Sequence, residues 1–234
     1  MKLGIMQPYF FPYLGYWQLM NAVDTYVICD DVAFIKQGWI QRNRIKGLNG
    51  PLYIRLQIHN ASPNRRINEL SIMHNERMER NRILTLKSVY AHAPYFEQTM
   101  ELFERIVNYE EDNLARFLTY AIHSVADYLQ MTTKFLVSSE LEKDNSLKAQ
   151  DRVLNICEIL GADTYINAIG GKELYDSESF AQRNLSLKFL RMDDDIVYPQ
   201  GKGEFIPSLS ILDVMMYNSV EEIRQLLTRY RLEN

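Results

Sequence analysis

Cysteine is almost absent from this chain, since Cys29 and Cys157 are the only two in 234 residues. Neither belongs to a CxxC pair or to a Cys/His spacing that holds a structural zinc ion. Two cysteines so far apart also form no disulfide framework of the kind that stabilises small secreted domains. We therefore expect no metal site and no structural disulfides, as is typical of a reducing compartment.

A basic excess and long apolar runs are missing as well. The 26 Lys and Arg residues face 30 Asp and Glu residues, for a net charge of −4, which disfavours a protein that wraps nucleic acid. No stretch approaches the roughly 18 consecutive apolar residues of a membrane span, and the first residues lack the apolar run of a signal peptide. These features predict a cytoplasmic protein with no membrane span and no bulk nucleic-acid partner.

The apolar residues, 47% of the chain, suffice for one sizeable core, and their pattern predicts an α/β fold. An apolar strand at 3–6, a helix at 14–23 and a second strand at 25–29 make a Rossmann-like βαβ start, which predicts a mostly parallel sheet. A strong turn is expected at 49–51. Further strands are expected at 39–45, 52–58, 164–167 and 186–190.

Helical periodicity dominates residues 74–134, with a break near 110–113. We expect this segment to be a helical insertion, and residues 1–73 and 135–234 to form the α/β domain. Later, Gly161 is placed to end a helix. The pairs Ser210/Asp213 and Ser219/Glu222 have the spacing of capping boxes that start two more helices.

An aromatic loop follows the first predicted strand. Pro8–Tyr13 contains two prolines and four aromatic residues. In open α/β sheets, ligands bind outside the carboxyl ends of the strands, and a helix N-terminus there offers free N–H groups to an anion. Aromatic rings stack on sugars and bases, although these rings could instead fill the core. We expect the loop to face a ligand, with hydrogen bonds from Gln7, Tyr9, Tyr13 and Tyr16.

A carboxylate pair, Asp30 and Asp31, ends the second predicted strand. Carboxylates at a strand end can act as a general base, bind a metal ion or accept a hydrogen bond from a ribose. The alternative is simple turn chemistry, because Asp favours turns. We expect Asp31 to act as a base and Asp30 to contact the substrate.

A basic and aromatic segment comes next in the chain. Arg42 and Arg44 have the same parity on a predicted strand, so they point to one face while Asn43 points to the other. Paired guanidinium groups suit a diphosphate or a carboxylate; a solvated strand face is the alternative. We expect the following residues to bind substrate: Lys36, Trp39, Arg42 and Asn43.

The four histidines show no metal-ligand spacing. His92, near the end of a predicted helix, is the best candidate for a base that deprotonates an amine, although a histidine there often only complements the helix dipole.

Gly170-Gly171-Lys172 could cradle a phosphate, with a turn as the alternative. Cys29 lies in an apolar strand and is expected to be inert. The sequence contains neither a Gly-x-Ser-x-Gly elbow nor a Walker loop.

The motifs together resemble the WbqC-like protein family. Its hallmark is Gln-Pro followed by a Tyr, a Pro and Gly-Tyr or Gly-Phe, as in Gln7-Pro8-Tyr9-Phe10-Phe11-Pro12-Tyr13-Leu14-Gly15-Tyr16. Many members have His before Gln-Pro, where this chain has Met6, so no role for such a histidine is carried over. Further matching segments keep their order along the chain: Asp24, Asp30-Asp31-Val32, Lys36, Trp39, Arg42-Asn43-Arg44-Ile45, Tyr90, Ala93-Pro94-Tyr95-Phe96, Gly161-Ala162-Asp163-Thr164-Tyr165, Tyr198-Pro199-Gln200 and Leu209-Ser210-Ile211-Leu212-Asp213.

The resemblance implies a role in making O-antigen lipopolysaccharide or related bacterial glycans, by transfer of a glycyl or other acyl group to an aminosugar. Tyr95 and Gln200, in two of the matching segments, are expected to contact the substrate. Ser210 starts a helix that is expected to face the same cleft. A looser likeness to the His-x-Gly-His loop of nucleotidyltransferases puts Tyr13 and Tyr16 where the histidines would stand, which favours nucleotide binding over phosphoryl transfer.

The leading hypothesis is an acyl or aminoacyl transferase that acts on a nucleotide-linked aminosugar. Its donor would be a thioester of coenzyme A or of an acyl carrier protein, and Asp31 or His92 would assist the amine. One alternative is a noncatalytic nucleotide-sugar-binding accessory protein. Another is a glycosyltransferase that uses Asp30 and Asp31 to hold a metal ion.

Overall fold

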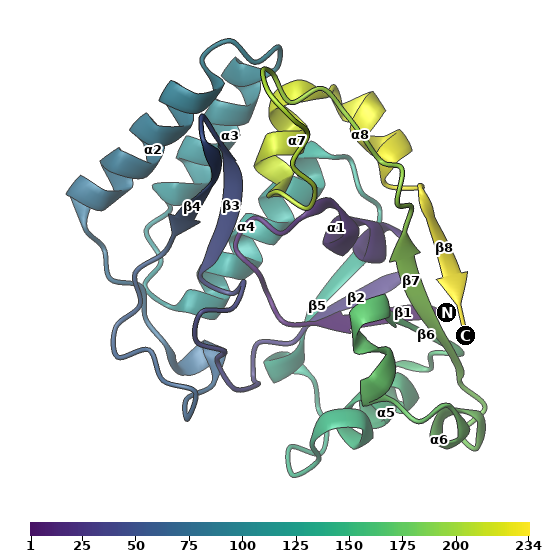
Figure 1. Cartoon of the computed structure of the whole chain (residues 1–234). Coiled ribbons are helices and arrows are strands. Elements are labelled where there is room, and N and C mark those ends of the chain that lie inside the picture. The colour runs from purple at the N-terminus through teal and green to yellow at the C-terminus, as the bar shows by residue number, and fades with distance from the viewer.

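The computed structural model describes residues 1–234 and contains a six-stranded sheet flanked by helices (Figure 1). Its strands lie in the order β5-β2-β1-β6-β7-β8. Only β8 runs antiparallel to its neighbour. This confirms the predicted α/β class with a mostly parallel sheet. The strands are β1 (Lys2–Met6), β2 (Thr25–Ile28), β5 (Lys134–Val137), β6 (Thr164–Ala168), β7 (Ser186–Met192) and β8 (Tyr230–Glu233).

The inner strands are the ones that the apolar pattern predicts. Leu3, Gly4 and Ile5 of β1 are buried between β2 and β6, as expected for a parallel strand covered on both faces. β2, β6 and β7 also lie where strands were expected. β5 and β8 were not predicted, because both are four-residue strands at the sheet edges, where packing leaves little pattern in the sequence.

Helices cover both faces of the sheet. Helix α1 (Leu14–Asn21) contributes to a core of 47 buried residues on one face. Helices α5 (Ala149–Leu160) and α6 (Ser177–Ala181) pack over the other face, around a smaller core of 13 buried residues. The connection from β1 to β2 and the connection from β6 to β7 therefore pass on opposite faces, as in doubly wound folds.

Five further helices lie beyond the α1 face. They are α2 (Glu76–Tyr90), α3 (Phe96–Val107), α4 (Leu114–Tyr128), α7 (Ile211–Tyr217) and α8 (Val220–Leu226). The expected break between two helices lies between α3 and α4. All five contribute residues to the same 47-residue core as α1, so the division into an α/β domain and an insertion at 74–134 stays a prediction.

Strands β3 (Arg42–Gly47) and β4 (Gly50–Arg55) form a separate antiparallel hairpin and do not join the main sheet. The expected turn lies between them. Asn43, Ile45 and Ile54 are buried on the inner face of the hairpin, and β3 contacts α7. The hairpin lies beyond the tip of β1 in Figure 1, so it extends the edge where the parallel strands end.

Two of the expected helix boundaries form as predicted. Gly161 ends α5 in the left-handed region, at φ +67°. Ser219 and Glu222 make a reciprocal capping box at α8. Ser210 caps α7 through the N–H of Leu212, but Asp213 turns into the core instead of closing the box.

None of the helices combines the length and apolar character needed to cross a membrane.

Candidate functional site

The strand order creates a switch point beside β1. From β1 the chain passes to β2 and then β5 on one side, whereas β6 and β7 lie on the other side. Connections diverge at such a point, and in open α/β sheets ligands bind in the crevice outside the strand ends there. The loop Gln7–Tyr13 leaves β1 at this position. The fold therefore places the aromatic loop at the carboxyl edge where a ligand is expected.

The middle of the loop is anchored to the rest of the protein. Asn43 Nδ2 donates to the carbonyls of Phe10 at 3.1 Å and Phe11 at 2.8 Å. Ser210 Oγ donates to the Phe11 carbonyl at 2.7 Å, and Phe11 has a left-handed backbone at φ +44°. Both phenyl rings are buried, so they fill the core, whereas Tyr9 and Tyr13 are half-buried. Asn43 and Ser210 thus position the loop, and a contact of theirs with substrate stays a prediction.

Tyrosines gather at the start of the loop. Tyr16 Oη donates to the Gln7 carbonyl at 2.7 Å, and the Tyr16 ring lies 5.2 Å from that of Tyr9 and 5.9 Å from that of Tyr26. Burial raises the pKa of Tyr16 and of Tyr26 well above the ordinary value, so both stay protonated donors. Sequence reasoning missed Tyr26, whose only signal is that it is the one aromatic residue of β2.

Two buried polar atoms of this cluster have no partner within the chain: Gln7 Oε1 and the Tyr26 hydroxyl. Buried polar groups are hydrogen-bonded in the great majority of cases. An acceptor and a donor without partners, next to the switch point, fit a polar ligand such as a sugar or a base.

Asp31 is held by two cations. Its carboxylate lies 2.9 Å from Lys143 Nζ and 3.5 Å from Arg152 Nη1, and the three side chains are at most 11% exposed. Burial raises the pKa of the Asp31 carboxyl, but the hydrogen bond from Lys143 and the charge of Arg152 outweigh it and leave the pKa below its ordinary value. A carboxylate with a lowered pKa is a weak base.

Asp30 is engaged by the loop that follows β5. Its carboxylate accepts from the Ser139 N–H at 2.9 Å and from Ser139 Oγ at 2.6 Å, and Asn68 Nδ2 lies 3.3 Å away. Asp30 therefore joins the end of β2 to the segment after β5, whereas Asp31 joins it to α5 and the segment before α5. Next to them, burial raises the pKa of the Cys29 thiol to about 12, so this cysteine is not a thiolate at neutral pH.

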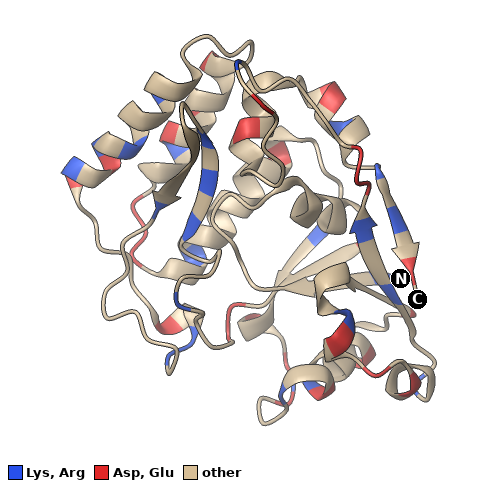
Figure 2. Ribbon diagram, in the orientation of Figure 1, with Lys and Arg blue, Asp and Glu red and all other residues tan.

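Arginines and aromatic rings alternate on the outer face of the hairpin. The Arg42 guanidinium lies 4.8 Å from the Tyr53 ring and 6.0 Å from the Trp39 ring, and Arg44 lies 5.5 Å from Trp39. Figure 2 shows the basic bands along β3. Lys36 is exposed nearby in the chain. Arg42 and Arg44 thus lie on one face, as their parity predicts, and the structure brings Trp39 to the same face.

The other expected site residues lie elsewhere. His92 is exposed just after α2, and Tyr95 is half-buried before α3, where its N–H donates to the Met216 carbonyl. Gln200 Nε2 donates to the hydroxyl of Tyr198, which in turn donates to the buried carboxylate of Asp213. These three residues are not gathered at the carboxyl edge, and their roles stay predictions.

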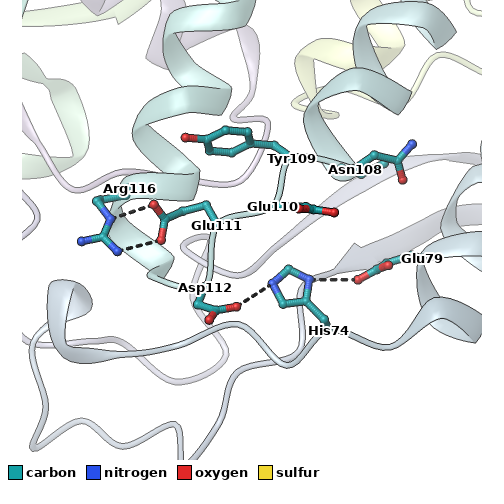
Figure 3. Close-up of a pocket in the computed structure, with 9 residues that line it drawn as sticks. His74, Glu79, Asn108, Tyr109, Glu110, Glu111, Asp112 and Arg116 are labelled. Atoms are coloured by element: carbon teal, nitrogen blue, oxygen red, sulfur yellow. Dashed lines mark hydrogen bonds and ion pairs between the residues drawn. The ribbon is translucent and has the colours of Figure 1, made fainter.

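A separate hollow of about 720 Å³ lies between the start of α2 and the α3–α4 connection. Its lining is mostly charged: His74 bridges Glu79 and Asp112 at 3.3 Å each, and Arg116 pairs with Glu111 (Figure 3). No three His, Cys, Asp or Glu side chains in the chain are arranged to hold a metal ion.

A family model for the WbqC-like protein family matches residues 7–225. The chain belongs to this family. The match begins at Gln7 and includes the loop, both carboxylates and the hairpin of this WbqC-like protein. It is 24% identical over 216 residues to Uncharacterized protein Rv1507c of Mycobacterium tuberculosis, a similarity that covers 92% of each chain. No solved structure matches the chain.

Proposed function

We propose that this WbqC-like protein is a transferase of bacterial glycan biosynthesis that adds an acyl or aminoacyl group to a nucleotide-linked aminosugar. The observation that carries the proposal is the switch point beside β1. There, Gln7 Oε1 and the Tyr26 hydroxyl lack partners, and the ring of Tyr9 is partly open. A sugar offers both hydrogen-bonding hydroxyls and a face that stacks on aromatic rings.

The proposed reaction forms an amide. The sugar amine attacks the carbonyl of a thioester on coenzyme A or an acyl carrier protein, the C–N bond forms, and the C–S bond breaks. The amine loses one proton, and the leaving thiolate takes one up. Amine acylation needs a neutral nucleophile, so a base or a favourable pH must hold the amine deprotonated.

The test is the mass of the product. The protein is incubated with uridine- or deoxythymidine-linked aminosugars and with acetyl or glycyl thioesters. We expect the sugar nucleotide to gain the mass of the acyl group, and an unchanged mass with every combination of sugar nucleotide and thioester would contradict the proposal.

The variants His92→Ala and Asp31→Asn are then compared with the wild type. Full activity in both variants would remove these residues as bases.

One observation favours a second function, a noncatalytic binding protein of the same pathway. The two candidate bases are poorly prepared for proton transfer, because Asp31 is neutralised by Lys143 and Arg152 and His92 is exposed to solvent. In this case a nucleotide-linked aminosugar raises the melting temperature while no acylated product forms.

A further inference from the structure

The outer face of the β3–β4 hairpin carries three arginines and no acidic partner for them. Arg42 and Arg44 lie on β3, and Arg55 of β4 lies opposite Arg42 in the strand register. Residues 42–55 include no Asp or Glu, and none of the three arginines makes an ion pair with any part of the chain. In a chain with more acidic than basic residues, this face has kept its positive charge unpaired.

The guanidinium groups are held in place by rings and backbone. Arg42 lies between the rings of Tyr53 and Trp39, and Arg44 lies over Trp39. Arg42 donates to the Gln37 carbonyl, and Arg44 donates to the Ser208 carbonyl at 3.4 Å. Each guanidinium has five N–H donors, so one backbone contact leaves most of them available. The face is therefore ordered before any ligand arrives.

Two of the guanidinium donors that have no acceptor within the chain are also shielded from water. Nε of Arg42 and Nε of Arg44 are buried and have no acceptor within the chain. Most buried polar atoms are hydrogen-bonded, and charged donors bind planar or tetrahedral oxyanions well. Two residues apart on a strand, the side chains stand roughly 7 Å apart at their origin, which allows both forks to reach one extended anion.

From these contacts we infer that the face of Trp39, Arg42, Arg44, Tyr53 and Arg55 binds a diphosphate group. The inference rests on the proposed function, in which the substrate is a nucleoside diphosphate sugar, and it assigns the diphosphate end of that substrate to the hairpin. The same chemistry could also come from a polyprenyl diphosphate lipid. The test separates these two sources.

Trp39 gives a local signal for the test. It is 38% exposed on the face, whereas Trp17, the other tryptophan, is fully buried. Titrating the protein with inorganic pyrophosphate, uridine diphosphate and geranyl diphosphate should change the tryptophan fluorescence, and Trp39→Phe should remove the change. A lower dissociation constant for uridine diphosphate than for geranyl diphosphate assigns the nucleotide source, and the reverse order assigns the lipid source.

The variants Arg42→Gln and Arg44→Gln test the donors. Each should weaken pyrophosphate binding about 10- to 100-fold, the cost of losing hydrogen bonds to a charged group. Arg42→Lys and Arg44→Lys keep the charge but lose the fork, so they should weaken it also. Arg224→Gln is the control, because Arg224 is an exposed arginine of α8 whose side chain donates to Gln130. Melting temperatures check that each variant folds.

Three results would overturn the inference. In the first, the variants Arg42→Gln and Arg44→Gln bind pyrophosphate as tightly as the control Arg224→Gln does. In the second, the wild type binds orthophosphate as tightly as pyrophosphate, and in the third it binds a single-stranded RNA dodecamer more tightly than uridine diphosphate. The proposed function is separable from it. Acylated product with no effect of the arginine variants on binding would reject the inference alone. Arginine-dependent diphosphate binding with no acylated product would reject the function alone.

Discussion

The buried ion pair of Asp31 supports a quantitative prediction. Asp31→Asn keeps the shape of the side chain but removes its charge, and it leaves Lys143, whose side chain is only 1% exposed, without a counter-ion. Removing one partner of a buried pair costs about 3–5 kcal/mol, because the remaining charge stays desolvated. Urea unfolding followed by circular dichroism measures this loss as a lower midpoint.

Two controls separate this mechanism from a general packing defect. In the double variant Asp31→Asn/Lys143→Met, the unpaired Lys143 charge is gone and only Arg152 still lacks the carboxylate, so part of the lost stability should return. Glu104→Gln breaks a pair with Lys87 in which both side chains are more than a third exposed, so it should cost at most about 1 kcal/mol. If Asp31→Asn also costs less than about 1 kcal/mol, the reasoning on burial is refuted.

The same pair predicts a pH dependence. The pKa of Asp31 is lower in the folded protein than its ordinary value, so the unfolded chain takes up a proton at higher pH than the folded one. The pair therefore contributes its full stability above the unfolded pKa of about 3.9, and this is lost as pH falls through the lower folded pKa. The stability difference between wild type and Asp31→Asn should shrink below about pH 4; a constant difference would contradict the assignment.

Three more variants test the loop, the site and a helix end. Asn43→Ala should cost about 1–3 kcal/mol in urea unfolding, because the Phe10 carbonyl loses its side-chain donor and the Phe11 carbonyl keeps only Ser210; an unchanged midpoint would show that the loop is held otherwise. Tyr26→Phe should melt no lower than the wild type, since the hydroxyl has no partner in the chain, yet bind nucleotide-linked aminosugars less tightly in calorimetry. Ser219→Ala should lower stability by about 1 kcal/mol through loss of the capping box, and no loss would mean that α8 depends on packing alone.

The parts of the fold that the sequence predicts are those with strong local patterns. The apolar strand at 3–6, the helix from Leu14 and the capping box at Ser219 depend on neighbouring residues, and all three form as expected. The hairpin strands were also expected. Their separation from the main sheet was not, because alternation shows that a strand forms but not which strand it pairs with.

The candidate site was predictable only in part, because its contacts join distant residues. The parity of Arg42 and Arg44 placed both on one face, where both also lie near Trp39, a contact that parity does not predict. In contrast, the partners of Asp31 come from the segment before α5 and from α5 itself, and no spacing rule links them to it. These contacts pair the Asp31 carboxylate with two cations, and its role as a base stays a prediction.

Hydrogen–deuterium exchange with and without a nucleotide-linked aminosugar tests the central claim most directly. The proposed ligand lies at the carboxyl edge of the parallel sheet and on the adjoining hairpin. With the ligand there, we expect slower exchange in residues 7–16, 28–31 and 39–45, and no change in residues 107–112, which line the charged hollow. Slower exchange confined to that hollow, or none in residues 7–16 at saturating ligand, would contradict it.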